Sequence, residues 1–116
     1  MSVYDMAHSL AAELKKSPEY LDYIRLKEIA EQNETQKALL GEYKKLQFQL
    51  QVAMAGGGAP DPNEMERLQK ISAVLQMSAE AGQYMLAEFR FQRMLADIYK
   101  ILGEAAGVDL DLLTGN

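Results

Sequence analysis

The chain has 116 residues and a formal net charge of −5, with no cysteine and a single histidine. A chain of this length forms one domain with a modest core, and it needs neither disulfides nor metal to fold. The missing cysteines exclude disulfides, thiolate-held zinc or iron–sulfur clusters and a cysteine nucleophile. Because Lys and Arg grip the phosphate backbone, the acidic balance argues against DNA or RNA as a partner.

Hydropathy and residue choice predict an all-α protein without a membrane-inserted segment. No run of about 18 apolar residues is present, so nothing is expected to span a membrane. Asp5 and His8 interrupt any apolar stretch of the kind that a signal peptide needs, which predicts a cytoplasmic protein. Long stretches are rich in Ala, Leu, Met, Glu, Gln and Lys, which lose little side-chain freedom in a helix.

The first two helices are predicted from their start signals. Ser2 is an N-cap residue with Asp5 at the capping-box position, so a helix is expected over Val3–Lys16. At Ser17-Pro18 the chain restarts, since Ser caps well and Pro at the first helical position loses no needed N–H. The second helix is expected to run to about Glu31. The apolar stripe of the first helix comprises Met6, Leu10, Ala11 and Leu14.

A third helix is predicted from Asn33, its cap, to about Ala55, with Gln36 at the capping-box position. Its apolar residues are spaced 4, 3, 4 and 3 apart, which gives a heptad-like seam over about two heptads. Such a seam is typical of a helical bundle. The seam consists of Leu39, Tyr43, Leu46, Leu50 and Ala53.

A flexible glycine-rich loop is predicted over residues 55–60. It is not a phosphate-binding loop, because it lacks the Gly-Lys-Ser/Thr ending and no strand leads into it. Asp61-Pro62 then opens a fourth helix, with Glu64 at the box position. Near Met77–Ser78 the chain is expected to bend, and Ser78 caps a new start. The apolar side of the fourth helix comprises Met65, Leu68, Ile71 and Leu75.

The fifth helix, expected over Ala79–Ala106, is the largest feature. At 1.5 Å per residue it is about 42 Å long, whereas a compact globule of this size is only about 35 Å across. It also carries two adjacent apolar stripes, so its apolar band is wider than one neighbour covers. The first stripe is Tyr84, Phe91, Leu95, Ile98 and Leu102, and the second is Met85, Phe89, Ala96 and Tyr99.

These features predict a homodimer or larger assembly whose long helices pack across a two-fold axis. The alternative is a monomer in which the other helices cover both stripes. We therefore expect an elongated bundle of about five helices in one domain, residues 1–116. The residues that we expect to form the interface with a second copy or a partner are Leu39, Tyr43, Leu46, Leu50, Tyr84, Met85, Phe89, Phe91, Leu95, Ile98 and Leu102.

The domain divides into three parts along the chain. Residues 1–32 form the two N-terminal helices, and residues 33–106 form the long-helix core. Residues 107–116 form a tail, because Gly107 is expected to end the fifth helix. The tail mixes acidic residues with Leu110, Leu112 and Leu113. Docking on a partner and folding back on the bundle are both open interpretations for it.

Chemistry-bearing residues are sparse. Asp5 and His8 stand three apart, as metal ligands on one helical face would, but one histidine cannot supply the two Glu-x-x-His motifs of a di-iron bundle. We interpret Asp5 as a capping acid and His8 as a surface residue. No nucleophile–base pair is recognisable, so the sequence predicts no enzyme, no metal and no cofactor.

A basic group on the fifth helix offers candidate polar contacts. Arg90, Arg93 and Lys100 lie near one face and could touch RNA or an acidic partner. Asp97 stands four residues after Arg93, and Glu104 stands four after Lys100. Local ion pairing on a solvated face is therefore the simpler interpretation.

Taken together, the segments of the chain resemble the YlbF/YmcA family of small bacterial helical proteins, most closely its YheA-like branch. The resemblance covers nearly the whole chain. Its motifs are mostly packing residues, so their order and spacing carry it. The segments are Val3–Ala11, Ser17–Tyr23, Leu39–Gln49, Tyr84–Ile98 and Ala105–Leu110.

The resemblance implies an all-α fold that assembles through its long helices. For better-studied relatives it implies regulation of competence, biofilm formation and sporulation, in a complex that adjusts messenger-RNA processing by a membrane-associated ribonuclease. That complex is associated with iron–sulfur clusters held by cysteines. This chain has no cysteine, so the clusters are not expected here.

The leading hypothesis is a non-enzymatic regulator or adaptor that binds itself and a regulatory protein partner through its helices. One alternative is a self-assembling structural protein without another partner. A second alternative is an RNA-associated factor that uses Arg90, Arg93 and Lys100, whose RNA binding would weaken with salt.

Overall fold

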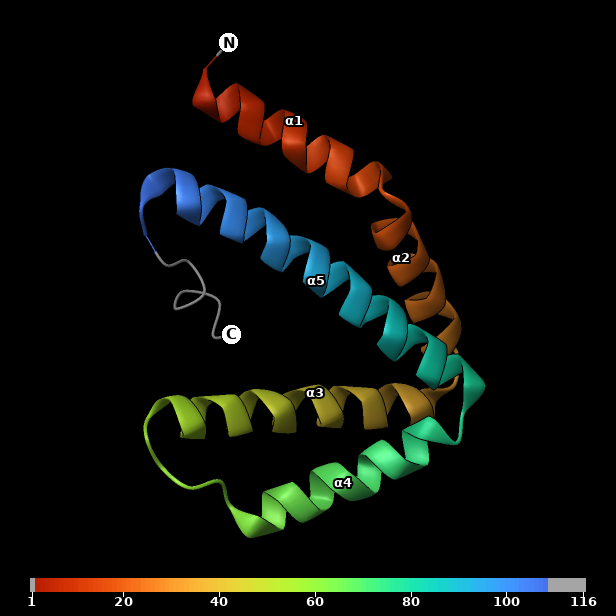
Figure 1. Ribbon diagram of the computed structural model, residues 1–116. Coiled ribbons are helices and arrows are strands. Elements are labelled where there is room, and N and C mark those ends of the chain that lie inside the picture. Colours follow the sequence, from red (N-terminus) through yellow and green to blue (C-terminus); the bar gives the residue numbers. More distant parts are fainter. Residues whose placement is uncertain (1, 109–116) are drawn as a thin grey trace.

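The computed structural model describes residues 2–108, and these form five helices with no strand among them (Figure 1). The predicted all-α class is confirmed, and the predicted helix bounds agree to within one residue. The helices are α1 (Val3–Lys16), α2 (Pro18–Ala30), α3 (Glu34–Ala55), α4 (Pro62–Gln76) and α5 (Ala79–Ala106).

Each helix begins at a side chain that accepts a hydrogen bond from a backbone N–H of the first turn. Ser2 and Asp5 form a reciprocal capping box, with both bonds 3.1 Å long. Such a cap stabilises a helix by about 1 kcal/mol, which explains why the local sequence predicts the bounds. The other caps are Ser17, Asn33, Asp61 and Ser78.

Two of the expected capping boxes take a different form. The Gln36 side chain donates to the carbonyl of Ala30 at 2.7 Å and so satisfies the end of α2, across the α2–α3 turn. Asp61 accepts from the N–H of Asn63 at 2.8 Å, one position before Glu64. In both places the cap residue was predicted correctly, but the predicted return bond between the side chain of Gln36 or Glu64 and the N–H of the cap residue does not form.

The last helix ends at Gly107, as predicted. Its φ of 75° lies in the left-handed region, which glycine adopts without steric cost. The N–H groups of Gly107 and Val108 both donate to the carbonyl of Gly103, at 2.8 and 3.0 Å. This turn satisfies an otherwise unpaired helix-terminal acceptor. The tail residues Leu110, Leu112 and Leu113 lie outside the described residues.

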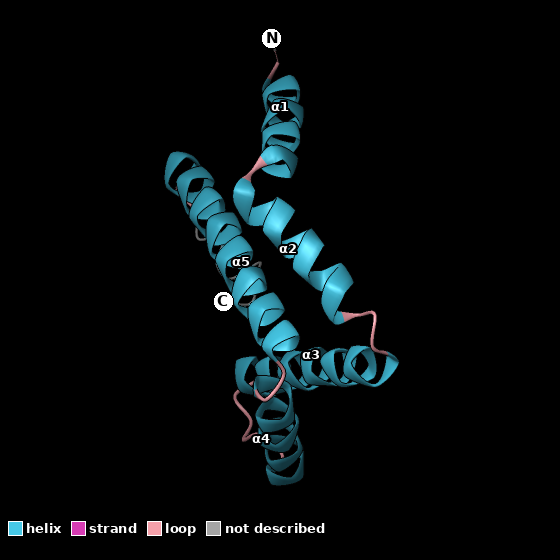
Figure 2. Ribbon diagram, turned by 90° about the vertical axis from the view of Figure 1, so that its right-hand side faces the viewer, coloured by secondary structure: helices cyan, strands magenta, loops and turns pink. Residues whose placement is uncertain are grey.

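The five helices form two arms that meet at one end and open at the other (Figures 1 and 2). In the long arm, α2 packs against the first half of α5, and α1 continues from α2. In the hairpin arm, α3 and α4 pack side by side in opposite directions. The Cα radius of gyration is 16.8 Å, compared with about 13 Å for a compact chain of this length, so the chain is extended.

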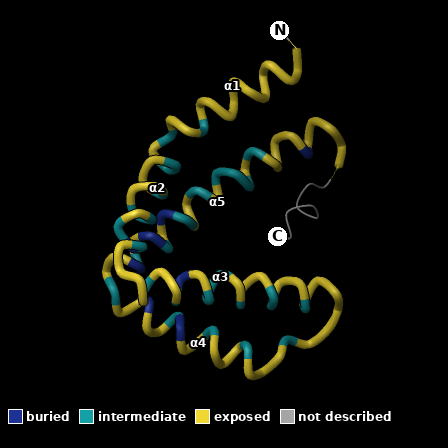
Figure 3. The backbone as a smooth tube through the Cα atoms, turned by 180° about the vertical axis from the view of Figure 1, so that it is seen from behind, coloured by how far each residue is buried: buried dark blue, intermediate teal, exposed yellow. Residues whose placement is uncertain are grey.

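The core lies where the two arms meet, and Figure 3 shows buried segments gathered there. Four helices contribute to it, but α1 does not contribute a buried residue. Tyr84 is the largest side chain that is fully buried. The core cluster, as we call it below, consists of Ala30, Leu40, Ile71, Leu75, Ala81 and Tyr84.

The predicted heptad-like seam of α3 packs within the chain itself. All five of its residues are half-buried. Leu39, Tyr43 and Leu46 pack against the core cluster. The α3 residues of the candidate interface therefore stabilise the junction between the arms, where α3 meets α4 and α5.

Candidate interaction surface

A polar network joins the two arms beside the core cluster. Lys44 of α3 forms an ion pair with Glu88 of α5, with Nζ 2.8 Å from Oε2. Tyr84 donates its hydroxyl hydrogen to the same carboxylate oxygen at 2.8 Å, and Lys44 donates to the Tyr84 hydroxyl. Burial, together with the hydrogen bond to Glu88, raises the pKa of Tyr84 above its ordinary value. The hydroxyl therefore stays protonated as a donor.

Aromatic rings fasten α2 to the first half of α5. The ring of Tyr23 stacks on Tyr84 and on Phe91, with centroids 5.8 and 5.2 Å apart. Tyr20 meets Phe91 edge to face at 5.4 Å. Such pairs contribute about 0.5–1.5 kcal/mol each beyond area burial. Phe91 and Tyr84 thus stabilise contacts within the protomer.

The structure separates the candidate interface residues of α5 into three groups. Tyr84 is in the core, and Met85, Phe91, Leu95 and Ile98 are half-buried. Phe89 is 60% exposed, and Leu102 is about half exposed. Of these residues, Phe89 and Leu102 are the ones that the fold leaves exposed.

A groove runs between α3 and α5 where the arms begin to diverge. Its hollow of about 390 Å³ is lined by Lys44 and Glu88 and by the glutamines Gln47, Gln51 and Gln92. Phe48 lines this hollow and is 67% exposed. Phe89 of α5 lines an adjoining hollow of about 170 Å³. The groove therefore combines two open aromatic rings with a polar, mostly uncharged rim.

Sequence reasoning missed Phe48 as an open apolar side chain, and with it Val52. Both are exposed and stand four residues apart on α3. This spacing places them on one face, away from the predicted seam. The apolar pair at i and i+4 outside the seam was the signal that could have identified this face.

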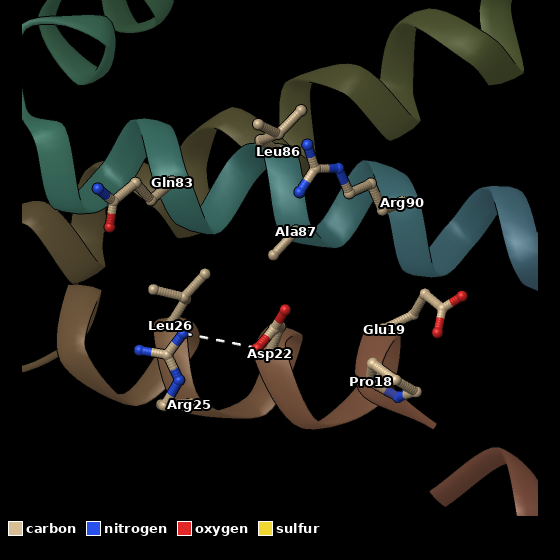
Figure 4. Close-up of a pocket in the computed structure, with 9 residues that line it drawn as sticks. All are labelled: Pro18, Glu19, Asp22, Arg25, Leu26, Gln83, Leu86, Ala87 and Arg90. Carbon is tan, nitrogen blue, oxygen red and sulfur yellow. Dashed lines mark ion pairs between the residues drawn. The ribbon is translucent and has the colours of Figure 1, made fainter. Parts of the chain in front are cut away.

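A second groove lies between α2 and α5 and has a volume of about 550 Å³. Figure 4 shows Leu26 and Ala87 between the two helices, with Leu86 and Arg90 above them on α5. Asp22 pairs with Arg25 at 3.5 Å on the α2 side. Its lining residues are Pro18, Glu19, Asp22, Arg25, Leu26, Gln83, Leu86, Ala87 and Arg90.

The structure places both candidate polar residues, Arg90 and Arg93, on the exposed outer side of α5. They line one hollow together with Glu19 and Asp97, so its charges balance. Among the described residues, neither the expected Arg93–Asp97 ion pair nor the expected Lys100–Glu104 ion pair forms within 4.0 Å. Exposed pairs gain little over hydration and cost side-chain entropy, which accounts for this error. RNA contact by this face stays a prediction.

The N-terminal residues are placed as the sequence analysis interpreted them. Asp5 belongs to the capping box of α1, and His8 is exposed. Within residues 2–108, no cluster of three or more His, Cys, Asp or Glu side chains has the arrangement of a metal site. No helix in this range is long and apolar enough to cross a membrane.

Comparison with known proteins decides the family. A family model described as control of competence regulator ComK, YlbF/YmcA, matches residues 3–105. The chain belongs to the YlbF/YmcA family. The match covers the five helices except for the last residue of α5, so the resemblance drawn from the sequence is confirmed at the family level. The finer assignment to a YheA-like branch stays a prediction.

Similar proteins match this chain over most of their own length. A UPF0342 protein of Desulfitobacterium hafniense is 33% identical over 90% of this chain and 85% of its own length. A UPF0342 protein of Symbiobacterium thermophilum is 34% identical over 93% of this chain and 96% of its own length. A protein of unknown function (DUF964) from Bacillus stearothermophilus has the same fold, with a TM-score of 0.73, 21% identity and coverage of 90% and 92%.

Proposed function

We propose that this YlbF/YmcA protein is a non-enzymatic, cytoplasmic regulator or adaptor that acts by binding other proteins through its helices. Family membership suggests the regulatory role, since the matching model is named for control of a competence regulator. The observation that carries the binding role is the amount of surface that the protomer leaves open.

The accessible surface of the chain is 8519 Å². A compact monomer of this mass exposes about 6,300 Å², so the excess is roughly 2,200 Å². Large apolar side chains are exposed on this surface, and they include the rings of Phe48 and Phe89. Large exposed apolar patches are a mark of protein-interaction sites, which supports association as the activity of this protein.

The α3–α5 groove suits an amphipathic helix of a regulatory protein partner. Phe48 and Phe89 offer aromatic surface to its apolar residues, and aromatic side chains are enriched among those that dominate binding energy. Gln47 and Gln92 supply amide groups for hydrogen bonds at the rim. Helix-in-groove recognition uses this combination of apolar contacts with a polar border.

The test is affinity capture from the source cell with matched baits. We expect the wild-type chain to retain a specific protein. The F48A/F89A double variant should retain about tenfold less of that protein, because the loss of two aromatic contacts weakens binding by more than about 1.4 kcal/mol. The control is Leu86→Ala, which removes an apolar side chain that is 50% exposed in the α2–α5 groove. Equal recovery by wild type and the double variant would contradict this proposal.

A further inference from the structure

The lining of the α3–α5 groove carries almost no free charge. Its two hollows share Lys44, Gln47, Glu88 and Gln92, so they form one continuous surface. Within the described part of the chain, Lys44 and Glu88 are the two charged residues of this lining, and they pair with each other. The chain as a whole has a formal net charge of −5, so the neutrality is a local property of the groove.

The Lys44–Glu88 pair is compensated within the protein. One oxygen of the Glu88 carboxylate accepts from the Lys44 ammonium and from the Tyr84 hydroxyl, each at 2.8 Å. The ammonium also lies over the Tyr84 ring, 4.8 Å from its centroid, where the ring face attracts a cation. Neither charge is therefore left for a group on an incoming molecule.

Amide groups are the other polar feature of the groove. Gln47 and Gln51 stand four residues apart on α3, Gln92 lies on α5, and all three are exposed. The Gln47 amide donates to the Tyr43 hydroxyl at 3.1 Å. Because an amide carries both donors and an acceptor, it can pair with an Asn, Gln, Ser or Thr side chain of a partner without any charge.

A charged side chain that enters this groove loses hydration and meets no free counter-charge. Burial of an unpaired charge is unfavourable, and interfaces use this penalty to reject wrong partners. A stripe of apolar residues avoids the penalty and gains contact with the exposed rings of Phe48 and Phe89. The lining is therefore complementary to an uncharged helix face.

We propose that the Lys44–Glu88 pair determines the specificity of the α3–α5 groove. By neutralising the lining, the pair selects a partner helix whose buried stripe is apolar, with Asn, Gln, Ser or Thr as its polar residues, and rejects stripes that contain acidic or basic residues. The inference rests on the proposed function and names the partner class of the same site.

Three synthetic helical peptides test the wild-type chain by fluorescence anisotropy. Each has about 18 residues, or about 27 Å as a helix, with a leucine stripe on an alanine background. The central position of the stripe is Gln, Glu or Lys. At about 0.15 M salt, which screens long-range attraction, the Gln peptide should bind at least about tenfold more tightly than either charged peptide. Equal binding of the three peptides, or no binding of any, overturns the proposal.

Variants that separate the pair should change the preferred peptide. Glu88→Gln leaves the Lys44 ammonium without its carboxylate, so binding of the Glu peptide should strengthen at least about tenfold. Lys44→Gln should strengthen binding of the Lys peptide for the converse reason. The matched control is Glu66→Gln, which makes the same change of charge in the exposed Glu66–Lys70 pair of α4. The control should keep the wild-type order of peptides, and the proposal fails if both separated variants keep that order as well.

The charge-swapped variant K44E/E88K provides a second measurement if a separated variant loses its helical circular dichroism. It keeps a neutral pair at the same place, so the Gln peptide should again bind most tightly. A preference of this variant for either charged peptide would overturn the proposal.

Cell capture separates this inference from the proposed function. A partner that is captured through Phe48 and Phe89 by a stripe containing charged residues overturns the inference and leaves the function standing. Preference for the Gln peptide without any captured partner supports the inference and contradicts the function. Light scattering of the free wild-type and F48A/F89A chains addresses a second copy of the chain as the occupant, because a difference in their mass would place a copy in the groove and overturn the inference.

Discussion

Tyr84 shows how one residue serves both the core and the junction between the arms. Its ring is fully buried against Tyr23, while its hydroxyl meets the Lys44–Glu88 pair. Every buried side-chain polar atom among residues 2–108 has a hydrogen-bond partner. Hydrogen bonds thus compensate the buried hydroxyl for its loss of water. A buried polar group without a partner would cost about 1–3 kcal/mol of stability.

The raised pKa of Tyr84 predicts a loss of stability at high pH. A tyrosine in the unfolded chain ionises at about pH 10. In the folded chain, burial and the Glu88 hydrogen bond raise the pKa of Tyr84, so its hydroxyl stays protonated at higher pH. Its contribution is therefore fully present below about pH 10 and falls as pH rises further, because only the unfolded state releases the proton.

Urea unfolding of wild type and Tyr84→Phe between about pH 8 and pH 11 measures this effect. The stability advantage of the wild type should shrink above about pH 10, since phenylalanine does not titrate. Tyr4→Phe, at an exposed position, is the matched control. Curves for Tyr84→Phe and wild type that stay parallel throughout would show that the hydroxyl is not held in this way.

At the scale of the helix, the Ser17 side chain forms hydrogen bonds with both the end of α1 and the start of α2. Its hydroxyl donates to the Leu14 carbonyl at the end of α1, at 2.6 Å, and accepts from the Tyr20 N–H at the start of α2, at 3.2 Å. We expect Ser17→Ala to lower the free energy of unfolding by about 1 kcal/mol, because both groups lose a partner at a helix end.

Chemical denaturation of Ser17→Ala and Ser9→Ala measures the capping contribution separately from the loss of a hydroxyl. Ser9 is exposed in the middle of α1, where alanine is the better helix former. The control should therefore match or slightly exceed the wild type. Equal stability of the two variants would mean that Ser17 does not act as a cap.

Helix bounds were predictable because their signals are local. Ser17-Pro18, Asp61-Pro62 and Ser78 each mark a helix start within a few residues of sequence. The direction of each apolar face was not predictable in the same way. Phe89 and Tyr84 both belong to apolar stripes of α5, but Tyr84 is buried whereas Phe89 is 60% exposed. Which stripe is covered depends on helix packing, and the spacing of residues does not specify it.

At the scale of the molecule, the Lys44–Glu88 pair links the hairpin arm to the long arm. Its side chains are 39% and 18% exposed, whereas those of the Lys70–Glu66 pair within α4 are 68% and 63% exposed. Partial burial reduces screening by water. We therefore expect a coupling energy of about 1 kcal/mol for Lys44–Glu88, compared with about 0.3–0.5 kcal/mol for the exposed helical pair.

Double-mutant cycles with alanine at each pair measure these two couplings from the free energies of unfolding. The Lys70–Glu66 cycle serves as the control, since both of its residues lie on one helix. A Lys44–Glu88 coupling no larger than that of the control would mean that the pair does not hold the arms together.

The two arms meet at the core cluster, so a rotation of one arm there displaces its free end. Helix α5 begins at that cluster and extends for 28 residues, or about 42 Å. A turn of about 10° at its base therefore moves its far end by roughly 7 Å, which is more than one helical turn. A change in packing around Tyr84 that is too small to alter the helices is thus magnified at the free end of α5, where Ile101 and Leu102 are exposed.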